Sequence, residues 1–237
     1  MVQAGWWRLK PAYRDFRQGV FDVLPILFAA TPIGLLWGTL AVAKGLSPLE
    51  VWFTSATVFA GAAQFVAIEL WSDPVPWLLL TATALIVNVR HILMGASLSR
   101  HMGSIERRWH PLMMFVMADE NWAFSEKRAL TTPLTFAYYF GLAAPMWVAW
   151  TSSSIVGAIV GRSLGDPAAF GFDFAFSALF IGILAGFWKG PRTGIVLGVS
   201  AIAAALAKIY IEGAWYIVVG GIAGASVAAL LHQEETP

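Results

Sequence analysis

The stretch "ALIVNVRHILMGASLS" (84–99) decides the class of fold, because it sets an arginine inside an apolar run. It begins as a membrane segment and then places Asn88, Arg90 and His91 within four residues. An arginine at the centre of a membrane helix costs roughly 2.5–3.5 kcal/mol on insertion scales. The chain therefore has to offer this charge a partner or a route to water.

The composition around this stretch is that of a protein that crosses a membrane several times. Of 237 residues, 58% are hydrophobic and 12% charged, and the mean hydropathy is +0.69, whereas soluble domains carry about 25% charged residues. A net charge of +1 without a basic stripe gives no support to nucleic acid as a partner. The absence of cysteine excludes disulfides and thiolate chemistry. The sequence predicts an all-α polytopic protein of the cell membrane.

Apolar runs predict a bundle of seven to eight helical segments. A basic N-terminal segment (1–18) and a short C-terminal tail (232–237) are expected to flank a single transmembrane domain (19–231). The basic and aromatic start does not have the pattern of a cleaved signal peptide. Several runs are short for a span of about 20 residues, so some segments are expected to be broken or re-entrant. The runs cover residues 19–43, 49–70, 76–98, 111–124, 133–160, 172–188, 193–207 and 214–231.

The distribution of basic residues leaves the topology open. Four of them precede the first span and predict a cytoplasmic N-terminus by the positive-inside rule; they are Arg8, Lys10, Arg14 and Arg17. Eight simple crossings would then place the basic loop 100–108 outside, against the rule. Either a segment before this loop is re-entrant, or the loop is tolerated.

Small residues recur at a spacing of four, as Gly34/Gly38 and Gly157/Gly161, and each pair precedes a similar turn. An internal repeat, which is common in secondary transporters, would explain why the same spacing and a similar turn occur twice. Ordinary small-residue packing between membrane helices is the alternative. Together with Gly220/Gly224, these pairs form more small-residue packing surfaces, or seams, than the helices of one monomer obviously need. We therefore expect one seam to pack on a separate small membrane subunit.

The stretch "VFAGAAQF" (58–65) puts small residues in the middle of a span. Broken backbone at membrane depth is tolerated only where it is buried in protein or lines a cavity. We expect the helix to unwind or kink at 61–63 with the following amide facing a central cavity, which makes this a candidate substrate site. The alternative is a tight helix crossing with the amide satisfied by a neighbouring helix. The candidate residues are Gly61, Ala62, Ala63 and Gln64.

On a helix, Asn88 and His91 share a face, and we expect that face to meet the same cavity and bind substrate. Arg90 points elsewhere, either snorkelling to the interface, pairing with an acid or taking a substrate carboxylate. The candidate acids for ion pairing or proton coupling are Asp119 and Glu120 in "MADENW", which the pattern favours, and Asp22 and Asp173. Both favoured acids are expected at the end of the short segment 111–124.

Signatures of enzymes are missing from the sequence. It holds no G-x-S-x-G, no H-E-x-x-H, no Walker loop and no G-x-G-x-x-G. Its histidines are spaced too irregularly for a metal site on one helix face. The sequence therefore predicts no cofactor, no metal and no enzymatic activity.

Several motifs occur in an order that resembles the AzlC family, the large subunits of two-component branched-chain amino acid exporters. They are "TPIGLLWGTLAVAKGLSPLE" (31–50), "VFAGAAQF" (58–65), "NVRHILMGASLS" (88–99), "MADENWA" (117–123) and "GFDFAFSALF" (171–180). The resemblance covers residues 16–231. It implies export of valine, leucine and isoleucine driven by a proton gradient, and a small AzlD-type membrane subunit as partner. The alternatives are transport of another small amphipathic solute and a scaffold role in which the partner binds substrate.

Overall fold

All regular structure in the described part of the chain is helical, which confirms the predicted fold class. The computed structural model describes residues 6–164, 181, 185, 188, 190–211 and 215–231. Within these residues, four helical stretches are long and apolar enough to cross a membrane. They are Pro11–Ala43, Trp77–Ser99, Phe136–Ser163 and Pro191–Tyr210.

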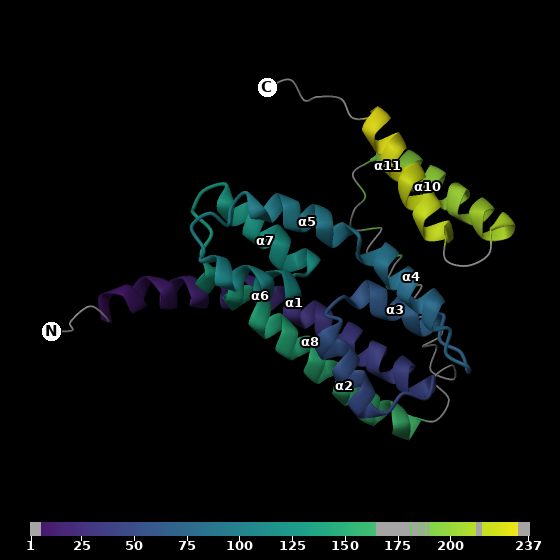
Figure 1. The fold of residues 1–237 in the computed structure, drawn as a ribbon, viewed down its shortest axis with the longest axis horizontal. Helices are drawn as coiled ribbons and strands as arrows, with labels where there is room; N and C mark the ends of the chain where they lie inside the picture. The colour runs from purple at the N-terminus through teal and green to yellow at the C-terminus, as the bar shows by residue number, and fades with distance from the viewer. Residues whose placement is uncertain are drawn as a thin grey trace.

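The longest helices, α1 (Trp6–Ala43) and α8 (Phe136–Leu164), pack against each other along their length (Figure 1). Gly19 lies against Tyr138, and further along both helices Gly38 lies against Ala158. Contacts that advance together in this way mean that the two helices run parallel. Because α1 already begins at Trp6, the basic segment predicted as a separate unit continues into the first span.

The small-residue pairs of α1 and α8 are two sides of this one interface. A Cβ atom on Gly34 would meet Ser153, one on Gly38 would meet the backbone of Ser154, and one on Gly157 would meet the backbone of Leu35. Close packing therefore accounts for the shared spacing. The third pair is used as well, because Gly220 packs on Ala204. All three pairs therefore pack within the chain and give no support to a separate subunit, which stays a prediction.

A first hairpin, α2 (Pro48–Thr57) and α3 (Gly61–Glu69), starts beside the end of α1. The indole nitrogen of Trp147 donates to the carbonyl of Ala56, 3.1 Å away, near the end of α2. The chain then breaks, and α3 returns so that the ring of Phe65 lies 6.4 Å from that of Trp37. The run 49–70 is thus a re-entrant hairpin. Its break covers 58–60, just before the predicted 61–63.

The next span consists of α4 (Trp77–Asn88) and α5 (Arg90–Ser99), separated by a break at Val89. It runs from the side of the first hairpin to the end where α1 and α8 begin (Figure 1). Two contacts fix its arrival there: His101 pairs with Glu126 at 3.2 Å, and Ser104 donates to the carbonyl of Leu134 at 3.1 Å.

A second hairpin enters from that end. It comprises the short 3-10 helix η1 (Arg107–Trp109), α6 (His110–Phe115) and α7 (Asp119–Ala129). The ring of Trp109 stacks on Phe136 at 4.4 Å, at the start of α8. The hairpin reaches mid-depth at its break, 116–118, and returns to the same end. Asp119 and Glu120, predicted to end a helix, instead begin α7, because the break falls just before them.

This path resolves the conflict over the basic loop. The first hairpin is re-entrant and the second span crosses back, so loop 100–108 reaches the end of the bundle that also holds Arg14, Arg17 and Arg128. The opposite end holds Lys44 and Arg162. Of the two explanations left open by the sequence, the structure shows the re-entrant segment.

Two further helices, α10 (Pro191–Tyr210) and α11 (Trp215–Leu231), form an antiparallel hairpin that contacts α4 (Figure 1). Gly220 packs on Ala204, while Gly224, one turn further on, packs on Ser200. The opposite order of these contacts shows the antiparallel arrangement.

Candidate functional site

The breaks of both hairpins and the break at Val89 meet at one cavity of about 620 Å³. Small and apolar side chains make up most of its wall, and four ionisable side chains lie in one part of it. From the breaks come Phe59, Ala60, Gly61, Ala62, Phe65, Arg90, His91, Ala118, Asp119, Glu120, Trp122 and Ala123, and from α1 and α8 come Ala30, Ile33, Met146 and Trp150. The cavity therefore lies among helix ends in the middle of the bundle.

The start of α3 faces this cavity without a side-chain cap. Its N-cap residue, Ala60, has non-helical backbone and makes no capping hydrogen bond with its side chain. The first N–H groups of a helix have no intrahelical acceptor, so those of Gly61 and Ala62 remain open to an anion. Gly61 packs closely on α8, because a Cβ atom there would lie 3.0 Å from the ring of Trp150 and the indole would have to shift to admit it.

Gln64 is buried behind this helix start and is not among the residues that line the cavity. Its amide donates to the hydroxyl of Ser55 at 3.2 Å and accepts from the indole of Trp150 at 2.9 Å. The indole of Trp37 donates to the same hydroxyl at 2.8 Å. Gln64 thus holds the first hairpin to α8 through Trp150. This is the alternative given in the sequence analysis, in which a neighbouring helix satisfies the amide. Ala63 is likewise buried outside the cavity wall.

The charged part of the cavity centres on Arg90. Its guanidinium Nη1 lies 2.6 Å from Oδ2 of Asp119, one of the two acids that the sequence favoured. The two side chains keep 40% and 46% of their surface exposed, so the pair borders open space and is not sealed in a core. It can therefore exchange partners with a solute that enters.

His91 and Asn88 separate at the break, although the sequence placed them on one face. His91 lines the cavity, and its Nδ1 lies 3.2 Å from the carbonyl oxygen of Asn88. The Asn88 side chain is not part of the cavity wall, and its buried Oδ1 has no hydrogen-bond partner among the described residues. Between them, Val89 keeps helical dihedral angles, but its N–H bonds to the carbonyl of Ile86, three residues back, so the α-helical hydrogen-bond pattern changes there.

The second break is fixed by Asn121, a residue that the sequence analysis did not select. Its side chain accepts from the backbone N–H of Ala118 at 2.9 Å and donates to the carbonyl of Val116 at 2.7 Å. It is fully buried and lies within α7. This clamp holds the two acids at the start of the helix in the cavity wall.

Of those two acids, Asp119 is paired and Glu120 is not. Glu120 lines the cavity and is half-buried, and no hydrogen bond or ion pair joins its carboxylate to another side chain in the described part of the chain. The indole N–H of Trp122, also in the cavity wall, is likewise unpaired within the described residues. The site therefore presents charged and polar groups that a solute can satisfy.

The apolar wall was missed by the sequence analysis. Ile33, Phe59, Phe65, Met146 and Trp150 have no signal that separates them from lipid-facing or core residues. Only the three-dimensional meeting of α1, α3 and α8 brings them together.

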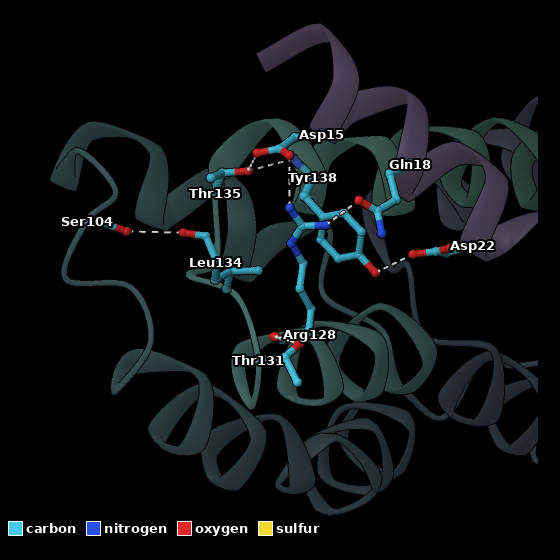
Figure 2. Close-up of polar contacts among 9 residues, drawn as sticks. All are labelled: Asp15, Gln18, Asp22, Ser104, Arg128, Thr131, Leu134, Thr135 and Tyr138. Atoms are coloured by element: carbon cyan, nitrogen blue, oxygen red, sulfur yellow. Dashed lines mark hydrogen bonds and ion pairs between the residues drawn. The ribbon is translucent and has the colours of Figure 1, made fainter. Parts of the chain in front are cut away.

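Asp22 belongs to a second polar site, which we call the Arg128 cluster: Asp15, Gln18, Asp22, Arg128, Thr135 and Tyr138. Figure 2 shows the Arg128 guanidinium between Asp15 and Gln18, over the ring of Tyr138. Its Nη2 donates to Asp15 at 2.9 Å, and the hydroxyl of Tyr138 donates to Asp22 at 2.8 Å. The cluster joins α7 to α1 and α8, outside the cavity wall. Asp173 lies outside the described residues.

This fold and site define a polytopic helical membrane protein with a charged central cavity between two broken hairpins. The model of the AzlC protein family matches residues 25–164, and the chain belongs to this family. The chain is 28% identical to the inner membrane protein YgaZ of Escherichia coli, over 94% of this chain and 92% of that protein.

A second relative is the branched-chain amino acid transport protein AzlC of Bacillus subtilis. It is 27% identical, over 79% of this chain and 76% of the relative. An uncharacterised membrane protein of Archaeoglobus fulgidus is 28% identical, over 91% of this chain and 93% of that protein. No solved structure matches the chain.

Proposed function

We propose that this protein is the large subunit of a secondary exporter of branched-chain amino acids, coupled to proton antiport and assembled with a small AzlD-type membrane subunit. A zwitterion cannot enter hydrocarbon unless both of its charges find partners. The observation that carries the proposal is one cavity that offers an uncapped helix start, charges of both signs and an apolar wall.

Each part of such a substrate has a counterpart in the cavity. The carboxylate is placed at the open N–H groups of Gly61 and Ala62, within reach of Arg90, because helix N-termini favour anions. The ammonium is placed at the acids that begin α7. The branched side chain is placed against Ile33 and Met146. Broken helices around a site at mid-depth are a recurrent arrangement in secondary transporters.

The proposed orientation places the basic end of the bundle in the cytoplasm of the cell. Arg100, Arg107 and Arg108 lie at the end where α1 begins, and the positive-inside rule assigns that end to the cytoplasm. The first hairpin then enters from outside and the second from inside. The two hairpins would close the cavity from opposite sides of the membrane.

Counterflow of labelled leucine in vesicles, with and without the co-encoded small subunit, tests this function. We expect leucine exchange that needs both subunits and that Arg90→Ala abolishes. Arg108→Ala is the matched control, because Arg108 pairs with Glu106 at an exposed site. Exchange of other amphipathic solutes but not leucine would favour the wider transporter class. Leucine binding by the small subunit alone would favour the scaffold role.

A further inference from the structure

The ionisable groups of the cavity do not balance. Within the described residues, Arg90 and Asp119 cancel as an ion pair at 2.6 Å, which leaves the carboxylate of Glu120 as one unmatched negative charge in the cavity wall that His91 also lines. The other cavity-lining elements that the structure describes bring no charged side chain to it: α1 contributes Ala30 and Ile33, α8 contributes Met146 and Trp150, and α3 contributes backbone and apolar side chains.

An unmatched carboxylate inside a membrane protein requires a cation, because an isolated charge in a poorly solvated site is costly. Two cations are at hand in the proposed exporter. One is the proton, which converts the carboxylate to a neutral acid. The other is the ammonium group of the substrate, which forms a charge-assisted hydrogen bond. The carboxylate cannot hold both, since a protonated acid carries no charge for the ammonium.

We propose that Glu120 is the common binding site of the proton and the substrate ammonium, so that each expels the other. When the amino acid arrives, the O–H bond of the carboxyl breaks and its proton leaves to solvent. The ammonium keeps its own three protons and pairs with the carboxylate. The inference rests on the proposed function and supplies its coupling: one proton is exchanged for each substrate molecule.

Proton release on substrate binding measures this exchange directly. Leucine is added to the purified complex of both subunits in weakly buffered solution with a pH indicator. We expect the parental complex to release one proton per bound leucine at low pH, where Glu120 is protonated, and none at high pH. The apparent affinity for leucine therefore rises with pH.

Glu120→Gln keeps the size and hydrogen-bonding ability of the side chain and removes its titration. We expect it to bind leucine roughly ten- to a hundredfold more weakly, since hydrogen bonds to charged groups are stronger than neutral ones. Its binding should release no proton and show no pH dependence, and a pH gradient should no longer drive leucine accumulation. Glu120→Asp should restore proton release.

Two further variants separate this role from its rivals. Glu126→Gln alters a second α7 acid, which pairs with His101 outside the cavity wall, and should release protons like the parental complex. His91→Gln alters a residue of the cavity wall, and the leucine that it still binds should release protons in the same ratio. A release that disappears with His91→Gln and persists with Glu120→Gln overturns the inference and assigns the proton to the histidine.

The outcomes also separate this inference from the function on which it rests. Leucine counterflow with unchanged proton release in Glu120→Gln overturns the inference alone. Absence of leucine counterflow and binding in the parental complex overturns the proposed function, and the inference with it. Should Glu120→Gln fail to fold, the parental complex decides, because leucine affinity that does not change with pH contradicts a shared site.

Discussion

The two hairpins reach the same cavity but are held in place by different chemistry. The first is fixed by neutral hydrogen bonds, from Trp37 to Ser55 and from Trp150 to Gln64, and the helix after its break begins with small residues. The second also has neutral hydrogen bonds, at Asn121, but its base is anchored by the ion pair of Arg128 with Asp15, and two acids follow its break. One tip can therefore offer backbone groups to an anion, and the other carboxylates to a cation.

The two hairpins differ most at the first residue after each break. At Gly61, a Cβ atom would lie 3.0 Å from the ring of Trp150, so no side chain fits without displacing the indole. At the corresponding position of the second hairpin, Asp119 reaches Arg90. Close packing therefore disfavours a side chain directly after the first break, whereas a charged side chain is accommodated directly after the second.

Gly61→Leu should have the largest effect on function. The leucine side chain fills the space beside Trp150 and covers the open N–H groups, so we expect loss of leucine counterflow with normal membrane insertion. Counterflow and detergent-extracted yield are measured together. Gly103→Leu is the matched control, because no atom lies within 4 Å of a Cβ there. Counterflow at the parental rate in Gly61→Leu would show that the first tip does not contact substrate.

Arg128→Ala should have the largest effect on stability. The arginine and Asp15 side chains are 8% and 15% exposed, and removing one partner leaves a buried charge, which costs about 3–5 kcal/mol. The loss is read as a lower thermal midpoint of the detergent-purified protein. Arg108→Ala removes an exposed pair, worth about 0–1 kcal/mol. Equal midpoints for the two variants would contradict a charge-based anchor for the second hairpin.

Gln64→Ala should have an intermediate effect. It leaves the buried indole nitrogen of Trp150 without an acceptor, at a cost of about 1–3 kcal/mol. Thr57→Ala is the matched control, since the Thr57 hydroxyl is exposed and bonds only within its own helix in the described structure. Midpoints are compared at low and high salt. A salt-dependent loss would contradict the neutral character of this anchor.

Ser47→Ala should have the smallest effect. Ser47 and Glu50 form a capping box where α2 enters the bundle, and loss of an N-cap costs about 1 kcal/mol. Leucine counterflow should be unchanged, since this cap lies at the exposed base of the first hairpin and not at its tip. A loss of counterflow larger than the loss of stability would mean that the base of the hairpin takes part in transport.

The sequence predicted the interruption of the first hairpin and the acids available to Arg90, because Gly, Ala and buried charges carry strong local signals. It did not predict the function of Gln64, since an amide in a span suits a cavity and a hydrogen-bonded core equally well. Only the positions of Trp37 and Trp150 decide between them.

The direction of the hairpins was also beyond the sequence. A run such as 49–70 has the length of a span, and no local pattern shows that α3 returns along α1. The basic loop 100–108 gave the only indirect signal, because a simple crossing count placed it on the wrong side. The structure settles the point, because Ser55 and Phe65, on the two arms of the hairpin, both contact Trp37. Loop 100–108 then meets the start of α8 through the hydrogen bond from Ser104 to Leu134.

Single-cysteine labelling tests most directly the claim that the two hairpins enter from opposite sides. The chain has no cysteine, so Lys44→Cys, Ser72→Cys, Gly103→Cys and Thr132→Cys can each be labelled alone with a membrane-impermeant maleimide. The account predicts that Lys44→Cys and Ser72→Cys react from one face of the membrane and Gly103→Cys and Thr132→Cys only from the other. Labelling of Lys44→Cys and Ser72→Cys from opposite faces would contradict it, because the first hairpin would then be a crossing helix.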